Sequence, residues 1–61
     1  MLTGRVEKHK GLTLIVDASM AWVSIVHDET GFMFEGPVTS DSDVRRIARV
    51  AVNAIKTIAG R

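Results

Sequence analysis

Few side chains in this 61-residue chain have the types and spacing that catalysis requires. The two histidines, His9 and His27, are far apart in sequence, and there is no cysteine to complete a thiol pair or a zinc site. Glu35 lies within an apolar stretch, and strand alternation points it away from Phe34. The glycines match no phosphate-binding fingerprint. We therefore expect a non-enzymatic protein with no catalytic residue, cofactor, metal ion or small-molecule substrate.

A cluster of basic residues in the C-terminal third could bind phosphate groups. Arg45, Arg49 and Lys56 fall within about 40° of one another on a helical wheel, with Arg46 and Asn53 beside them. A solvated helix face would carry the same residues, and bases near a helix C-terminus also suit the helix dipole. The pI of about 8.3 is below the value typical of a nucleic-acid-binding domain.

An aromatic side chain, Trp22, is the other candidate for contact with a partner. Tryptophan anchors protein interfaces because it buries much area at little cost in conformational entropy. The chain has only three aromatic residues and no tyrosine, so a core position for Trp22 is the competing interpretation.

Composition places the chain among globular proteins, with 46% hydrophobic and 25% charged residues. The absence of cysteine favours a reducing compartment, and we expect a cytoplasmic protein. No apolar run approaches the roughly 20 residues that cross a bilayer, so we expect no membrane partner. The net charge of +1 gives no general attraction to polyanions.

The hydrophobic pattern predicts one α+β domain over residues 1–61, a small antiparallel β-meander of three to four strands followed by one amphipathic helix. Short connections favour hairpins. In the first strand, Leu2, Gly4 and Val6 are expected to face the core. Ser40 and Asp43 have capping-box spacing, and Gly60 is a helix stop. The expected strands cover 2–8, 12–17, 20–27 and 32–35, and the expected helix covers 41–59.

The helix carries more apolar surface than one small sheet can cover. Its apolar arc spans roughly 200°, whereas a surface helix needs a stripe of little more than 100°. The expected strands also carry apolar residues on both faces, and a core this small supplies only about 3–5 kcal/mol. We therefore expect a homodimer. The predicted interface residues are Val50, Val52, Ala54 and Ile58.

The sequence thus favours a small accessory or regulatory protein that acts as a homodimeric protein-interaction module, such as a phage-type inhibitor or regulator. The alternative is a nucleic-acid-binding protein that uses the basic helix face. The predicted partner-binding residues are Arg45, Arg46, Arg49, Asn53, Lys56 and Trp22.

Overall fold

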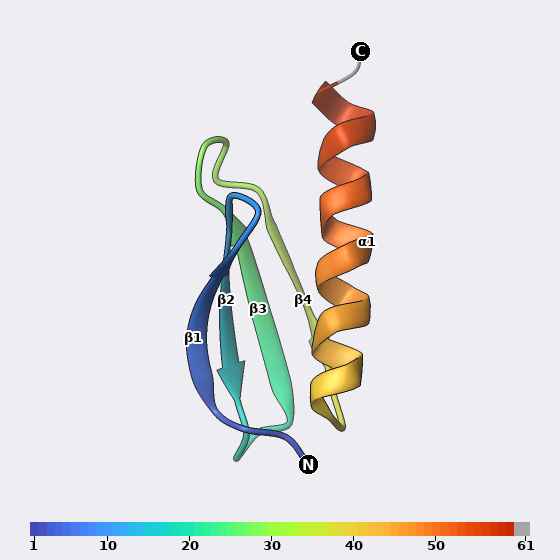
Figure 1. Ribbon diagram of the computed structural model, residues 1–61. Helices are drawn as coiled ribbons and strands as arrows, with labels where there is room; N and C mark the ends of the chain where they lie inside the picture. Colours follow the sequence, from blue (N-terminus) through green and yellow to red (C-terminus); the bar gives the residue numbers. More distant parts are fainter. Residues whose placement is uncertain (60–61) are drawn as a thin grey trace.

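The computed structural model describes residues 1–59 and has the predicted ββββα order (Figure 1). The helix bounds agree with the prediction, and the strand bounds differ by up to three residues. The predicted helix stop at Gly60, the end of the domain at Arg61 and the side chain of Ala59 lie outside the described part. The elements are β1 (Arg5–His9), β2 (Leu12–Asp17), β3 (Trp22–His27), β4 (Met33–Pro37) and α1 (Asp41–Ala59).

The four strands form one antiparallel meander in the order β1-β2-β3-β4. Lys10 and Gly11 alone connect β1 to β2, with φ angles of 49° and 79°. Two positive φ angles are typical of the type I′ turn, whose twist matches that of the flanking strands. The hairpin holds His9 opposite Leu12 and Arg5 opposite Val16.

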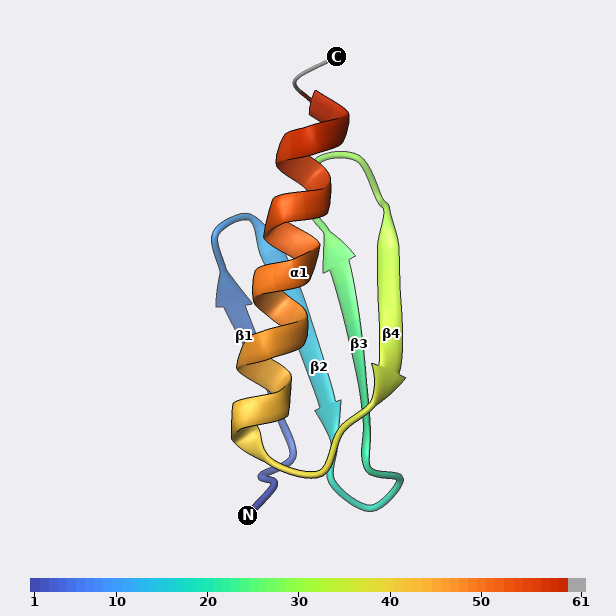
Figure 2. The same cartoon turned by 90° about the vertical axis from the view of Figure 1, so that its right-hand side faces the viewer.

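The helix covers one face of this sheet and packs on β2 and β3 (Figure 2). Alternate residues of these strands point toward it, with Leu14 paired to Ile25 and Val16 paired to Val23. Burial of these aliphatic side chains is the main force that holds the two layers together. The buried core consists of Leu12, Leu14, Val16, Val23, Ile25, Val38, Val44, Ala48 and Ala51.

The start of α1 is stabilised by its own polar residues. The Asp43 amide donates to Ser40 Oγ at 3.4 Å. The Asp43 carboxylate accepts from the amide and hydroxyl of Thr39 at 2.9 and 2.6 Å. Ser40 therefore caps the helix as expected, while Asp43 reaches back to Thr39 rather than to the Ser40 amide of a standard capping box.

The expected orientation of the first strand is wrong. Arg5 and Glu7 pair with the buried Val16 and Leu14, so they share the helix side of the sheet, and Val6 is 67% exposed on the outer face. The reason is that β1 is an edge strand and α1 lies over β2 and β3, so the helix does not require apolar residues from β1. Leu2 precedes the strand and does pack against the core.

The outer face of the sheet has no covering layer among residues 1–59 (Figure 1). Cross-strand neighbours place Val6 beside Ile15 and Val26 beside Met33 on this face, with Trp22 at the start of β3 opposite Asp17 and Pro37. Of these side chains, Val26 is partly buried and the other four are exposed. Within the described chain, no helix has the length and hydropathy needed to cross a bilayer.

Candidate nucleic-acid interface

A cleft of about 430 Å³ runs between β1 and α1 on the helix side of the sheet. Its floor is aliphatic and its two walls carry most of the charge. The floor residues are Leu14, Val44, Ala48 and Val52. The strand wall consists of Arg5, Glu7, His9 and Lys10, and the helix wall of Arg45, Arg49, Asn53 and Lys56.

The periodicities of the two elements explain these walls. In α1, Arg45, Arg49 and Lys56 recur at intervals of four and seven residues and therefore share one flank of the helix. In β1, Arg5, Glu7 and His9 alternate with outward-facing residues. The walls face each other because α1 packs on β2 and β3 and leaves a cleft between its flank and β1.

The positive charge of the cleft is not neutralised by carboxylates of the described chain. Within residues 1–59, four basic side chains have no carboxylate oxygen within 4.0 Å, and all four line this cleft. The other three basic side chains of that range, which belong to Arg5, Lys8 and Arg46, form ion pairs. The four are Lys10, Arg45, Arg49 and Lys56.

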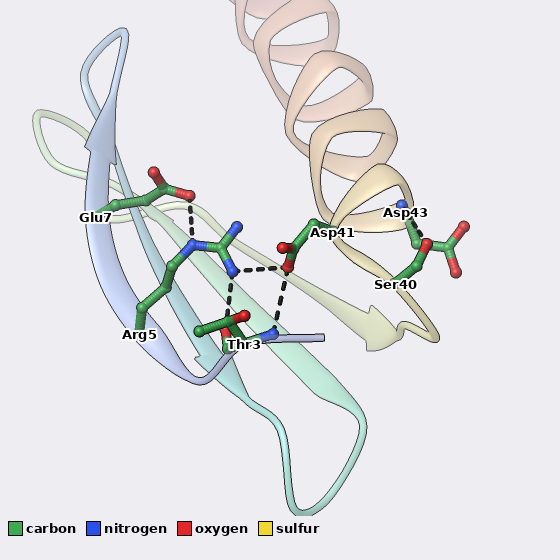
Figure 3. A network of polar contacts seen from close by, with 6 residues as sticks. All are labelled: Thr3, Arg5, Glu7, Ser40, Asp41 and Asp43. Atoms are coloured by element: carbon green, nitrogen blue, oxygen red, sulfur yellow. Dashed lines mark hydrogen bonds and ion pairs between the residues drawn. The ribbon is translucent and has the colours of Figure 1, made fainter. Parts of the chain in front are cut away.

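Arg5 lines the cleft and bonds to Asp41 at the start of α1 (Figure 3). Its Nη1 donates to Asp41 Oδ1 at 2.8 Å and to the Thr3 carbonyl at 2.8 Å, and its Nε donates to Glu7 Oε1 at 3.0 Å. The hydrogen bond from Arg5 lowers the pKa of Asp41, and the same bond raises the pKa of Arg5. Two carboxylates thus neutralise Arg5, and the available charge lies farther along the cleft.

Two other basic residues point away from the cleft. Lys8 lies on the outer face of β1, where its ammonium is 3.1 Å from Asp28 Oδ2. Arg46 is on the exposed side of α1, with Nη2 3.4 Å from Asp43 Oδ1. Both residues provide controls, because their removal changes the net charge without changing the cleft.

The structure brings together four of the six predicted partner-binding residues, namely Arg45, Arg49, Asn53 and Lys56. Arg46 is outside the cleft, and Trp22 is on the opposite face of the sheet, with Nε1 3.4 Å from Glu35 Oε2.

Sequence reasoning missed the whole strand wall of the cleft, which consists of Arg5, Glu7, His9 and Lys10. His9 and Lys10 lie at the end of this wall, next to the turn between β1 and β2. The run Lys8-His9-Lys10 before Gly11 was the available signal, but its two lysines point to different sides of the sheet.

The four residues predicted for a dimer interface do not share one surface. Val50 and Ile58 are exposed and Ala54 is partly buried. Val52 lines the floor of the basic cleft, about 160° around the helix from Val50. Ile58 instead borders a separate hollow of about 200 Å³ with Ile55 and Phe32.

The chemistry of the cleft suits anions. Guanidinium groups bind phosphate oxygens with paired hydrogen bonds, and lysine ammonium groups add point charges. Among residues 1–59, no three His, Asp or Glu side chains gather as a metal site. His27 is engaged in its own turn, with Nδ1 2.7 Å from Thr30 Oγ1.

Comparisons with known proteins identify no relative. No family model, curated protein or solved structure matches this chain. The assignment of a function therefore depends on the cleft and on the outer face of the sheet.

Proposed function

We propose that this protein binds nucleic acid without catalysis, through the cleft between β1 and α1. It would act as a small accessory or regulatory protein of the cytoplasm. The observation that carries the proposal is that the four basic side chains without an ion pair in residues 1–59 all line one cleft. Such a concentration of charge attracts phosphates locally, even though the net charge of the chain is only +1.

The spacing of the charges favours a polymer over a small anion. Arg45 and Lys56 are eleven positions apart on α1, which corresponds to about 17 Å along the helix axis at 1.5 Å per residue. A single phosphate group cannot contact both ends of such a row. A chain of phosphates can, and release of its counterions supplies much of the binding free energy.

The proposal is tested by fluorescence anisotropy with a labelled oligonucleotide in single-stranded and duplex form, over about 50 to 200 mM salt. The variant in which binding should be lost carries the two substitutions Arg49→Ala and Lys56→Ala in the cleft. The control is Lys8→Ala with Arg46→Ala, which removes the same two charges outside the cleft. Alanine favours helix, so the substitutions in α1 should preserve the fold, which circular dichroism would check.

We expect the wild type to bind with an affinity that falls as salt rises. The cleft variant should lose most of this affinity, and the control should retain most of it. Failure of the wild type to bind either form at the lowest salt would refute the proposal. An equal loss in both double variants would also refute it, because net charge rather than the cleft would then explain binding.

A homodimeric protein-interaction module is the second candidate, and the uncovered outer face favours it. Val6, Ile15, Trp22 and Met33 on that face are between 37 and 67% exposed. A second copy is the proposed occupant, because the same face carries Lys8 on one edge strand and Glu35 on the other, so both signs of charge are present for a twofold contact. A standard interface takes about 800 Å² from each partner. This is about a fifth of the 4136 Å² surface of the chain.

Light scattering tests this second candidate. A homodimer should have twice the 6.7 kDa mass of the chain, and Ile15→Lys on the outer face should convert it to a monomer. Val50→Lys on the exposed flank of α1 is the matched control, and it tests the helix as the alternative interface. A wild type that remains monomeric at high concentration would exclude the dimer.

A further inference from the structure

We infer that the cleft takes one single strand of nucleic acid, lying lengthwise between β1 and α1, and that it discriminates against duplex. This inference rests on the proposed function and specifies its ligand. The geometry of the charged walls is the basis for it.

The basic residues of α1 that line the cleft lie on the side of the helix rather than on its crest. The helix faces the sheet with Val44, Ala48 and Ala51, and the flank of Arg45, Arg49 and Lys56 is turned about 90–130° from that direction. A helix that enters the major groove of a duplex, which is about 12 Å wide, presents its crest to the base pairs.

The crest of α1 is poorly suited to reading a duplex. Counting about 100° per residue, it consists of Arg46, Val50 and Thr57, and Asn53 lies at its border with the cleft. Arg46 is paired with Asp43, and Val50 offers only an exposed aliphatic side chain. Thr57 donates its hydroxyl to the Asn53 carbonyl at 3.0 Å. The crest therefore offers few free donors for base edges.

A single strand that lies along the cleft would contact both of its walls. Lys10 and His9 line the strand wall, and Arg49 and Lys56 line the helix wall. The volume of about 430 Å³ is at the low end of the roughly 300–1,000 Å³ range of small-ligand sites. It can hold a short length of one backbone and excludes a duplex, whose phosphates would reach only the rim.

The length of the row sets the size of the site. About 17 Å of helix axis corresponds to about five nucleotides stacked at 3.4 Å, and to fewer when the strand is extended. At the other end, the charge of Arg5 is already paired with Asp41 and Glu7. The strand should therefore lie toward Lys10 and Lys56.

The lining also predicts weak dependence on base sequence. Aromatic platforms are the usual means by which proteins hold the bases of a single strand. His9 is the only ring among the described lining residues, and the floor is aliphatic. Most of the contacts should therefore go to phosphates, with at most one base stacked on His9.

The test compares one labelled oligonucleotide of about 12 nucleotides with the duplex formed from it and its complement, by anisotropy over a salt series. We expect the single strand to bind at least about tenfold more tightly, with a slope of log K against log salt near −2.8 for four phosphate contacts. An oligonucleotide of about five nucleotides should retain most of the affinity.

Matched single substitutions locate the strand. Lys10→Ala and Arg49→Ala should each reduce the slope by about 0.7. Lys8→Ala and Arg46→Ala should leave it unchanged, because these residues lie outside the cleft. Lys8 and Lys10 are two positions apart and point to different sides of the sheet. Because both substitutions remove one positive charge, a difference between them reports the position of the lysine relative to the cleft.

Two outcomes would overturn the inference while the proposed function stands. The first is duplex binding as tight as that of the single strand. The second is an equal effect of Lys8→Ala and Lys10→Ala. Absence of binding to both nucleic-acid forms would instead refute the proposed function itself and the inference with it.

Discussion

Replacement of Lys10 by asparagine should stabilise the fold and weaken nucleic-acid binding at the same time. Lys10 has a φ of 49°, in the left-handed region that L-residues with long side chains rarely occupy. The left-handed conformation costs roughly 1–2 kcal/mol for an ordinary residue, and asparagine tolerates it far better. Asn-Gly is also the preferred pair of a two-residue type I′ turn, and Gly11 already provides its second member.

The magnitude of the stability gain follows from this turn. No ion pair or side-chain hydrogen bond of Lys10 within residues 1–59 would be lost. We therefore expect the free energy of unfolding to rise by about 0.5–1 kcal/mol. For a domain of this size, the melting temperature should increase by about 2–8 °C.

Binding should change in the opposite direction. Loss of one of four phosphate contacts removes about 0.7 from the salt slope, which corresponds to about a fivefold loss of affinity at 0.1 M salt. Thermal and urea unfolding followed by circular dichroism would measure stability, and anisotropy with a single strand would measure affinity.

Ala21→Gly is the matched control. Ala21 also has a positive φ, 51°, but it lies in the β2–β3 turn, away from the cleft. This substitution should raise stability and leave affinity unchanged. A lower melting temperature for Lys10→Asn would refute the strained-turn argument. Higher stability with unchanged affinity would show that Lys10 does not contact the ligand.

Two further predictions concern the core and the response to acid. Ile25→Val should lower the free energy of unfolding by about 0.5–1.5 kcal/mol, because Ile25 is fully buried, whereas Ile15→Val on the outer face should have a smaller effect in the same urea titration. Acid should destabilise the fold. Hydrogen bonds lower the pKa of four aspartates in the folded chain below the pKa of the same groups in the unfolded chain. The contribution of these aspartates to the stability of the fold is therefore complete above about pH 4 and is lost as the pH falls through their folded-state pKa values. Unfolding curves measured from neutral pH to about pH 2 should show this decline, and Asp43→Asn should make it shallower; a profile that is flat in acid would contradict the assigned hydrogen bonds. The four are Asp17, bonded to Ser19; Asp28, bonded to Thr13; Asp41, bonded to Arg5; and Asp43, bonded to Thr39.

The sequence predicted the local elements well because local rules govern them. The start of α1 follows from the cap at Ser40, and the hairpin between β1 and β2 follows from Gly11 between two runs of strand character. The prediction for the first strand was wrong, because which face of this edge strand is buried depends on where α1 packs, and α1 packs on β2 and β3. The predicted apolar arc of α1 also combined two separate sides of the helix. One side carries Val52 and lines the cleft, and the other carries the exposed Val50.

The candidate site was only half predictable. The helix flank of Arg45, Arg49 and Lys56 is visible from the periodicity of the sequence, but the same pattern fits a solvated helix face. What strengthens the nucleic-acid hypothesis is the second wall, and its members His9 and Lys10 are more than thirty positions away from Arg45 along the chain. No local rule relates residues at that separation.

The sequence by itself determined the order of the elements, the extent of the helix and the basic flank that the helix carries, because caps, turns and hydrophobic periods act over a few residues. Only the tertiary structure decided that α1 lies over β2 and β3, so that the side of β1 bearing Arg5, Glu7 and His9 remains open toward the helix flank. The physical reason is that the aliphatic side chains of β2, β3 and α1 must be buried together, and this packing sets the distance and orientation between two charged surfaces that contribute little to folding.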